Sequence, residues 1–263
     1  MKVLIKLGGT LLDDPDKRND LARQLARVAH KVELVIVHGG GKQVTRFLEE
    51  RGVASRFVGG LRVSDETVID AVTKVIAGSI NKQLVAALCA AGQSSVGLSG
   101  VDGLLTTAQA VNAELQFVGK PQRTDSKLFH LLVDAGYLPV VACVAADAQG
   151  RIYNVNADQM AVSCAVGWGA DKLLFLTDVP GVKNGTGAVV PELTPKDVQD
   201  LIQSGVAHSG MQAKLESALW ALEEGLSEVV IAAGQEMDVC EQLLTGRPIG
   251  TRLTPNQSKG QRA

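Results

Sequence analysis

Residues 3–10 read VLIKLGGT, an apolar run that ends in two glycines and a threonine. The same design returns twice, as LVIVHGGG at residues 34–41 and as LLFLTDVPG at residues 173–181. Apolar runs bounded in this way are typical of buried parallel strands. Ligands of open α/β sheets bind beyond the carboxyl ends of the strands, where glycines let backbone N–H groups approach anionic oxygens. The three loops therefore predict a ligand that carries phosphate.

Short strands alternate with longer segments of helical period along the rest of the chain. Central strands are predicted at Val3–Leu7, Leu34–Val37, Leu138–Val144, Lys172–Thr177 and Glu228–Ala232. Apolar residues at three- and four-residue spacing predict amphipathic helices around residues 21–32, 68–79 and 128–135. This alternation predicts an α/β fold, a three-layer α/β/α sandwich with a mostly parallel central sheet.

Two turn-rich stretches interrupt the alternation, at Leu104–Gly119 and Ala145–Tyr153. They are expected to be hairpins added to the sheet, where they would form a lid or a substrate wall.

The composition excludes several classes of protein. Hydrophobic residues make up 46% of the 263 residues, enough for a sizeable core. With 26 Lys and Arg against 28 Asp and Glu, neither nucleic acid nor an anionic membrane is an expected partner. The four scattered cysteines form no CxxC pair and are expected to be core residues. The first apolar run is too short for a signal peptide, and no 18-residue apolar stretch occurs, so a cytoplasmic protein is expected.

The two commonest phosphate-binding signatures do not occur. The chain contains neither GxxxxGK[ST] nor GxGxxG, so a different cradle must hold the phosphate. A glycine pair after one strand is more often only a turn, but three such loops in one chain favour a binding site.

Six short motifs together resemble those of the acetylglutamate kinases, within the amino acid kinase family. They are KLGG at residues 6–9, HGGG at 38–41, GLRV at 60–63, NVNAD at 154–158, TDVPG at 177–181, and GM at 210–211 with Lys214. The resemblance spans residues 3 to about 253, and GLRV and NVNAD are its narrower motifs. It implies the amino-acid-kinase fold and ATP-dependent phosphorylation of the side-chain carboxylate of N-acetyl-L-glutamate, a step of arginine biosynthesis.

The resemblance also implies a catalytic set that fits this chemistry. Phosphoryl transfer to a carboxylate brings two anions together, so cations and N–H donors must cover the transferring group. Lys6 would stabilise that group, Lys214 the leaving side, and Asp158 would hold both lysines. As an ordinary carboxylate in the first turn of a helix, Asp158 would contribute only about 0.3–1 kcal/mol.

Substrate positions follow from the same resemblance. For the acyl acceptor it implies backbone donors at Gly40 and Gly41, a bidentate clamp at Arg62, and contacts to the acetamido end from Asn154 and Asn156. For ATP it implies Gly8, Gly9, Thr177, Asp178, Gly181, Gly210 and Met211.

ATP is expected as the co-substrate, with Mg²⁺ carried mainly by its phosphates, so no metal ligand of the protein is predicted. His38 is expected to be a structural residue, because a carboxylate nucleophile is already ionised at neutral pH and needs no base. Two positions depart from the family pattern: Gly59, where an asparagine is frequent, and Ser209, where many relatives have a second glycine.

Two other functions are weighed against this one. The first is another carboxylate or carbamate kinase of the same fold, such as one acting on a carrier-bound aminoadipate, which would favour a basic groove that is not evident. The second is a ligand-sensing member without catalysis, which is expected to have lost Lys6, Asp158 or Lys214.

An amino-terminal lobe is expected at residues 1–169, for acceptor binding and dimerisation. An ATP-binding lobe is expected at 170–253 and a disordered tail at 254–263. The resemblance implies a homodimer. It also implies insensitivity to arginine, because the first strand begins at Val3 without a preceding helix to link dimers, and because GRPIGTR at residues 246–252 is similar to the ending of the insensitive type.

Overall fold

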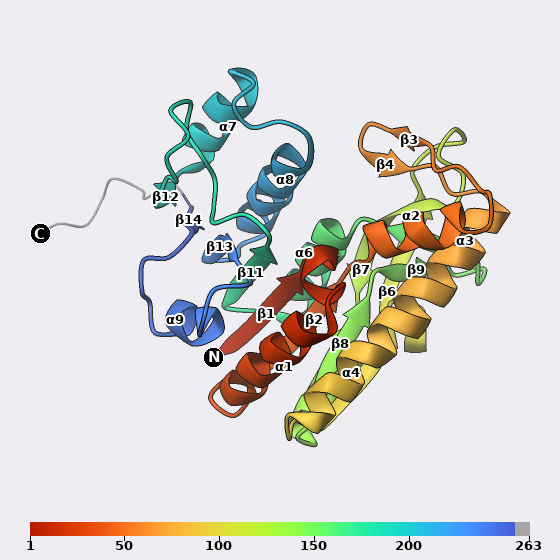
Figure 1. Cartoon of the computed structure of the whole chain (residues 1–263), viewed down its shortest axis with the longest axis horizontal. Helices are drawn as coiled ribbons and strands as arrows, with labels where there is room; N and C mark the ends of the chain where they lie inside the picture. Colours follow the sequence, from red (N-terminus) through yellow and green to blue (C-terminus); the bar gives the residue numbers. More distant parts are fainter. Residues whose placement is uncertain (256–263) are drawn as a thin grey trace, which may run out of the picture.

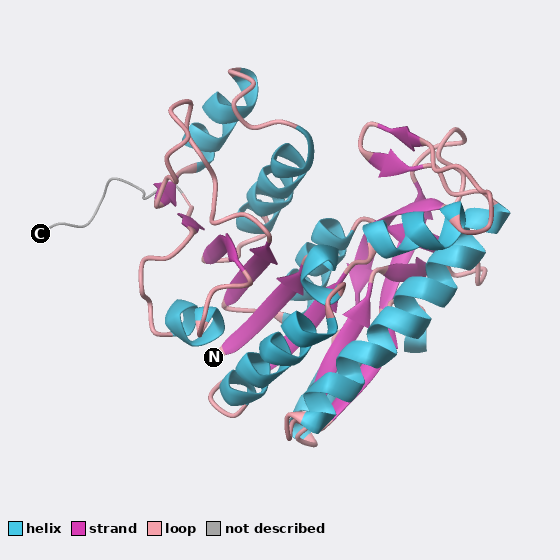
Figure 2. Cartoon of the chain, in the orientation of Figure 1, coloured by secondary structure: helices cyan, strands magenta, loops and turns pink. Residues whose placement is uncertain are grey.

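One eight-stranded sheet runs through the middle of the molecule (Figures 1 and 2). The structure is a computed structural model and describes residues 1–255. The strand order is β12 (Glu192–Leu193), β14 (Thr251–Leu253), β13 (Glu228–Ala233), β11 (Lys172–Thr177), β1 (Lys2–Leu7), β2 (Glu33–His38), β8 (Leu138–Ala142) and β5 (Ser95–Ser99). All neighbours pair in parallel except β13 with β14. The prediction of a mostly parallel sheet is confirmed.

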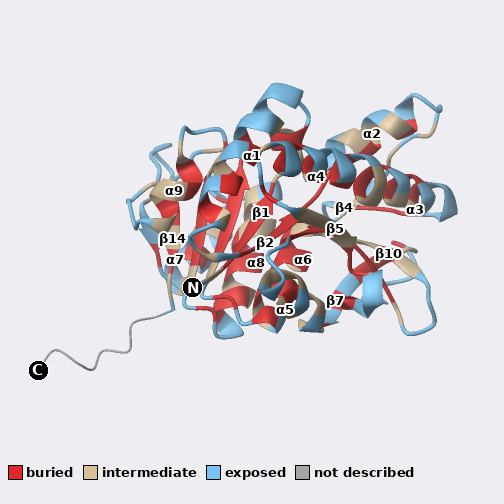
Figure 3. Cartoon of the chain, turned by 90° about the horizontal axis from the view of Figure 1, so that it is seen from below, coloured by how far each residue is buried: buried red, intermediate tan, exposed pale blue. Residues whose placement is uncertain are grey.

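Helices cover both faces of this sheet (Figure 3). One face carries α1 (Pro15–Ala29), α4 (Asn81–Ala90) and α9 (Val239–Leu244), and the other carries α5 (Lys127–Asp134), α6 (Ala157–Trp168) and α8 (Ser209–Glu223). The central strands β1, β2, β8 and β11 are therefore buried on both sides, which explains their largely apolar sequences. Burial of each Leu, Ile or Val there contributes about 1.5–3 kcal/mol.

The helix that leads into α4 has an unusual middle. Asp65 caps α3 (Glu66–Val72) by accepting a hydrogen bond from the Val68 N–H at 2.9 Å. A π-helical segment, η2 (Thr73–Ile80), then continues without a break into α4. Segments of π-helix are rare and often lie at functional sites, because they redirect the side chains of one turn.

Four short strands form a separate closed barrel, namely β6 (Thr106–Ala110), β7 (Val118–Thr124), β9 (Val144–Ala146) and β10 (Ile152–Val155). The two predicted hairpins do occur, but the expectation that they extend the main sheet is wrong. The single strand predicted at Leu138–Val144 breaks at Cys143, and its last residue begins β9. Closure pairs strand edges that an added hairpin would leave open. The buried Thr124 hydroxyl shares hydrogen bonds with the hydroxyls of Thr106 and Ser163, both at 2.9 Å, and these bonds fix the barrel against α6.

A two-residue turn joins β3 (Phe57–Val58) to β4 (Leu61–Arg62). Its residues, Gly59 and Gly60, both have positive φ, 55° and 78°. Two-residue turns of this kind favour Asn-Gly and Gly-Gly, because asparagine and glycine tolerate the left-handed region best. Glycine in place of a frequent asparagine at residue 59 therefore leaves the hairpin geometry intact.

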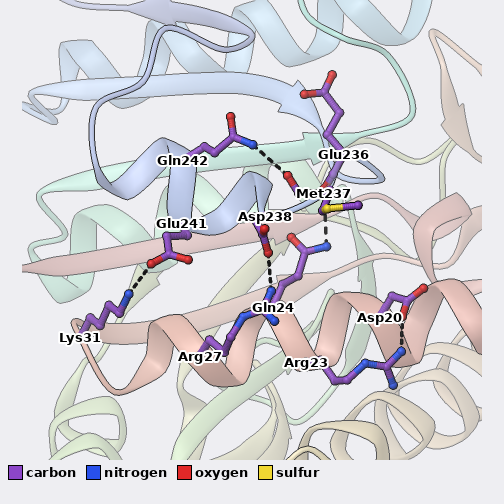
Figure 4. A network of polar contacts seen from close by, with 10 residues as sticks. All are labelled: Asp20, Arg23, Gln24, Arg27, Lys31, Glu236, Met237, Asp238, Glu241 and Gln242. Carbon is purple, nitrogen blue, oxygen red and sulfur yellow. Dashed lines mark hydrogen bonds and ion pairs between the residues drawn. The ribbon is translucent and has the colours of Figure 1, made fainter.

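The carboxyl-terminal part of the chain returns to the first helix. After α7 (Pro195–Gln203) and α8, the segment around α9 packs along α1 through a network of polar contacts (Figure 4). It contains ion pairs Arg27–Asp238 and Lys31–Glu241 and a hydrogen bond from Gln24 to the Glu236 carbonyl. These side chains are largely exposed, so each pair contributes about 0–1 kcal/mol, and apolar packing supplies most of the attachment.

Three of the four cysteines lie in the core as expected. Cys143, Cys164 and Cys240 are buried, and burial raises the pKa of each thiol to about 12. The expectation is wrong for Cys89, which is exposed because it lies on the outward face of α4. No disulfide links these residues.

The boundary predicted between two lobes at residue 169 stays a prediction. Strand β1 from the first segment pairs directly with β11 from the second, so the sheet is continuous across that boundary. Residues 256–263 of the predicted disordered tail lie outside the described part of the chain. No helix within residues 1–255 is long and apolar enough to cross a membrane.

Candidate active site

Two glycine loops face each other at the carboxyl ends of β1 and β2. A Cβ added to Gly9 would lie 3.2 Å from Gly40 Cα, and one added to Gly40 would lie 2.3 Å from Ile80 Cδ1. A side chain at Gly9 would press on the Gly40 backbone, and one at Gly40 would require the Ile80 side chain to move. Close packing therefore favours glycine at one position of the KLGG motif and one of the HGGG motif.

A pocket of about 230 Å³ opens beside these loops. Residues of both loops, the β3–β4 hairpin, the barrel and the start of α6 line it. Predicted site residues in its wall are Lys6, Gly9, Gly40, Gly41, Arg62, Asn154, Asn156 and Asp158. The barrel thus forms part of the wall of this pocket.

Asp158 lies between two lysines from distant parts of the chain. Lys6 Nζ is 2.8 Å from its Oδ1, and Lys214 Nζ is 3.0 Å from its Oδ2. The Asp158 and Lys6 side chains are 6% and 7% exposed, and that of Lys214 17%. Burial alone would raise the pKa of Asp158, but the two ammonium groups outweigh burial and hold the pKa below its ordinary value. The carboxylate is therefore ionised and fixes both cations.

Asn156 explains why Asp158 has this position. Its Oδ1 accepts hydrogen bonds from the Asp158 N–H at 2.8 Å and from the Gln159 N–H at 3.2 Å, so it caps α6. The predicted position of Asp158 in the first turn of a helix is confirmed. Because capping uses the Asn156 oxygen, its amide N–H groups remain for a ligand.

Arg62 is a buried cation without a carboxylate partner among residues 1–255. Its Nη2 donates to the Gly41 carbonyl at 2.8 Å and to Thr45 Oγ1 at 2.7 Å, and its Nη1 donates to Ser55 Oγ. The Phe57 ring lies 4.7 Å from the guanidinium carbon. Burial lowers the pKa of Arg62, and the charge of Glu49 partly opposes this shift.

These contacts leave at least two of the five guanidinium N–H groups for a ligand. A buried cation held only by neutral groups favours a bound anion, because its desolvation is not compensated within the protein.

The Ser64 hydroxyl connects Asn154 to the backbone of Arg62. Its Nδ2 donates to Ser64 Oγ at 3.1 Å, and that hydroxyl donates to the Arg62 carbonyl at 2.9 Å. Asn154 therefore belongs to the pocket wall and to the support of the hairpin.

His38 ends β2 in the interior, fully buried. Burial lowers its pKa to about 4, against the raising effect of its hydrogen bond to the Gly39 carbonyl, and nearby Lys6 lowers it further. The imidazole is neutral at physiological pH. Its hydrogen bonds to Gly39 and Asn81 agree with the predicted structural role. The sequence reasoning did not single out Asn81, because in the chain it is one polar residue within a helical pattern.

One expected donor is not available. The Gly8 N–H donates to the Leu176 carbonyl at 2.8 Å, so it does not face the site as predicted. The parallel pairing of β1 with β11 continues one residue beyond the strands and uses this group.

The other residues predicted for ATP lie outside the pocket wall. Thr177 ends β11 and donates to Asp178 Oδ1 at 3.1 Å, while Gly181 follows with φ 154°. Gly210 and Met211 lie in the first turn of α8, one turn before Lys214. Ser209 has φ 50°, a left-handed conformation that costs a non-glycine residue about 1 kcal/mol, which explains why glycine is frequent there.

No group of three or more His, Cys, Asp or Glu side chains among residues 1–255 is arranged to hold a metal ion. Both oxygens of Asp158, the carboxylate in the pocket wall, contact ammonium groups.

Comparisons with known proteins agree with this geometry. The family model described as "Amino acid kinase family" matches residues 1–233. An acetylglutamate kinase of Solibacter usitatus is 52% identical over 254 residues, which cover 96% of this chain and 99% of that protein. One of Roseobacter denitrificans is 39% identical over 239 residues, covering 90% of this chain and 83% of that protein.

A solved structure of N-acetylglutamate synthase from Neisseria gonorrhoeae, in complex with coenzyme A and N-acetyl-glutamate, superposes with a TM-score of 0.86 and 27% identity. The match covers 96% of this chain and 59% of that one. The fold and the paired lysines define a small-molecule kinase of the amino acid kinase class. The chain belongs to this family and, by its similarity to curated relatives over nearly its whole length, to the acetylglutamate kinases within it.

We predict that Asp158→Asn lowers the free energy of unfolding by about 3–5 kcal/mol, because it leaves a buried ammonium group unpaired. Folding lowers the pKa of Asp158 below its ordinary value. The stability that the Asp158 carboxylate contributes is therefore fully present above the ordinary aspartate pKa and is lost as the pH falls through the lowered folded-state pKa. Urea titrations at neutral and acid pH would measure both effects. The exposed Asp134→Asn, at the end of α5, is the matched control and should change stability by less than about 0.5 kcal/mol. Equal stability of Asp158→Asn and Asp134→Asn would contradict the pairing of Asp158 with the two lysines.

Proposed function

We propose that this chain transfers the γ-phosphoryl group of ATP to the side-chain carboxylate of N-acetyl-L-glutamate. The observation that carries the proposal is the charge pattern of one pocket. Lys6 and Arg62 both line it, and only Lys6 has a carboxylate partner among residues 1–255. A dicarboxylate would place one carboxylate at Arg62 and present the other to the phosphoryl donor beside Lys6.

The reaction needs no proton transfer. An oxygen of the acceptor carboxylate attacks the γ-phosphorus, and the bond from the γ-phosphorus to the bridging oxygen of ADP breaks. The products are an acyl phosphate and ADP. The chain contributes positive charge on both sides of the transferring group, from Lys6 on β1 and Lys214 on α8, and the Gly40 and Gly41 backbone donors.

ATP is the co-substrate, and we propose that Gly9, Thr177, Asp178, Gly181, Gly210 and Met211 contribute to its site. Mg²⁺ would neutralise phosphate charge, held by the nucleotide and water, because the pocket offers it no free carboxylate. Four free cysteines support a cytoplasmic location, since reducing compartments keep thiols unpaired.

The chemistry predicts a large effect of removing either lysine. Lys6→Met and Lys214→Met should each lower kcat by about 10²-fold or more while the fold stays intact. An ADP-release assay with N-acetylglutamate, glutamate, aspartate, aminoadipate and carbamate would measure it and would also test the other acceptors. Lys2→Met, at the far end of the same strand as Lys6, is the matched control and should keep wild-type turnover. Near-normal turnover of Lys6→Met and Lys214→Met, or a wild-type preference for another acceptor, would contradict this proposal.

Arg62 should act on the acceptor alone. Arg62→Lys is expected to raise KM for N-acetylglutamate by about 10-fold or more and to change KM for ATP little, because an ammonium cannot reproduce the planar donor pattern. The matched control is Arg56→Lys, an exposed arginine next to the hairpin that pairs with Glu114 at 3.8 Å. If both KM values rise equally, Arg62 does not bind the acceptor.

We propose a homodimer, and the edge of the sheet supports it. Strand β5 is the last strand and pairs only with β8 among the described residues, so no strand covers its outer edge. Leu131 on α5 and Tyr137 beyond it, which precedes β8, are 67% and 45% exposed. Light scattering should give the mass of two chains with or without arginine. A monomeric mass, or a larger assembly, would exclude this state.

A further inference from the structure

We propose that Asn81 and His38 are positioning residues that set the direction of the Gly40 N–H in the pocket. The expected effect on turnover rests on the proposed function. The expected orientation of the Gly40 N–H follows from hydrogen-bond chemistry alone.

The carbonyl of Val140 fixes the orientation of Asn81. That oxygen can only accept, and it lies 2.9 Å from Asn81 Nδ2, with the Leu98 carbonyl 3.4 Å away on the same nitrogen. A reversed amide would place its oxygen against these two carbonyl oxygens. Asn81 is 1% exposed, so water does not relieve such a contact. The NH₂ group must therefore face Val140.

This orientation fixes the tautomer of His38. The Asn81 Nδ2 lies 3.0 Å from His38 Nε2, so Nε2 must accept the hydrogen bond and carries no proton. The proton of the neutral ring is then on Nδ1, which donates to the Gly39 carbonyl at 3.1 Å. The Val140 carbonyl thus fixes the direction of the Gly39 carbonyl through the side chains of Asn81 and His38.

The peptide plane transmits this direction to the next residue. No cis peptide bond occurs in the described chain, and in a trans peptide the C=O and the following N–H point in opposite directions. With its carbonyl held toward His38 in the interior, the peptide turns the Gly40 N–H away from His38. Gly40 lines the pocket and His38 does not. Within residues 1–255 no protein acceptor takes this N–H.

Adjacent residues of the same helix hold the loop by a second means. Ile80 and Ile76, from the π-helical segment, occupy the space that a Cβ on Gly40 would need, at 2.3 Å and 3.3 Å. Asn81 follows Ile80 directly. One turn therefore limits the position of Gly40 by packing and its orientation by hydrogen bonding.

The test compares substitutions that keep different halves of the imidazole. In His38→Asn the amide nitrogen can occupy the place of Nδ1 and donate to Gly39, whereas in His38→Gln the amide reaches the place of Nε2 and leaves Gly39 without its donor. We expect His38→Asn to keep kcat within about 10-fold of wild type and His38→Gln to lose about 10²-fold, the effect of one misdirected backbone donor. Lys82→Ala, an exposed neighbour of Asn81 that donates to Gly97, is the matched control and should keep wild-type kcat.

Two-bond ¹H–¹⁵N correlation spectra of the whole protein supply a readout that does not depend on turnover. Wild type should show His38 with its proton on Nδ1, and Asn81→Leu should lose that single tautomer. Equal kcat for His38→Asn and His38→Gln at equal thermal stability, or a proton on Nε2 in wild type, would overturn the proposal. If His38→Gln does not fold, the His38 tautomer measured in wild type and in Asn81→Leu still tests the proposal. Absence of turnover by wild type on every acceptor would instead remove the proposed function and leave the tautomer test in force.

Discussion

The carboxylate of Asp158, held between two ammonium groups, is the interaction on which the site depends. Lys6 comes from the first strand, Asp158 from α6 and Lys214 from α8. No local propensity brings these three positions together. The parallel pairing of β1 with β11 and the packing of α6 against β1 and α8 do so, and therefore the whole sheet serves to place one negative charge between two positive ones.

This triad is costly for stability and suited to phosphoryl transfer. Desolvation of buried charges is repaid only when each is paired, and a hydrophobic triad of similar volume would be about as stable or more so. Fixed cations gain their value when negative charge develops between ATP and the acceptor, because no reorganisation is then needed. The Lys214 side chain is more exposed than that of Lys6, so it is the more accessible of the two cations.

The sequence predicted those parts of the fold that local patterns of apolar residues determine. Residues 3–7 are apolar except for Lys6, and residues 173–176 are a continuous apolar run, so both central strands were placed to within a residue. The barrel was missed because nothing local marks Cys143 as the point where the chain leaves the sheet. Motifs predicted Lys6 and Asp158 as site residues. The partners of Arg62, such as Thr45 and Phe57, come from a different helix and strand and depend on tertiary packing.

The glycine loop after β2 shows why a motif alone does not specify a binding geometry. Gly40 has φ 179° and ψ 32°, and a Cβ there would lie 2.3 Å from Ile80 Cδ1, so packing against Ile80 favours glycine at this position. The absence of a side chain also makes the loop free to turn its N–H groups. Packing cannot prevent that rotation, because a peptide plane can turn with little change in volume. A directional bond is needed, and a neutral histidine, kept neutral by burial and fixed in one tautomer by an amide, provides it without adding a charge beside Lys6.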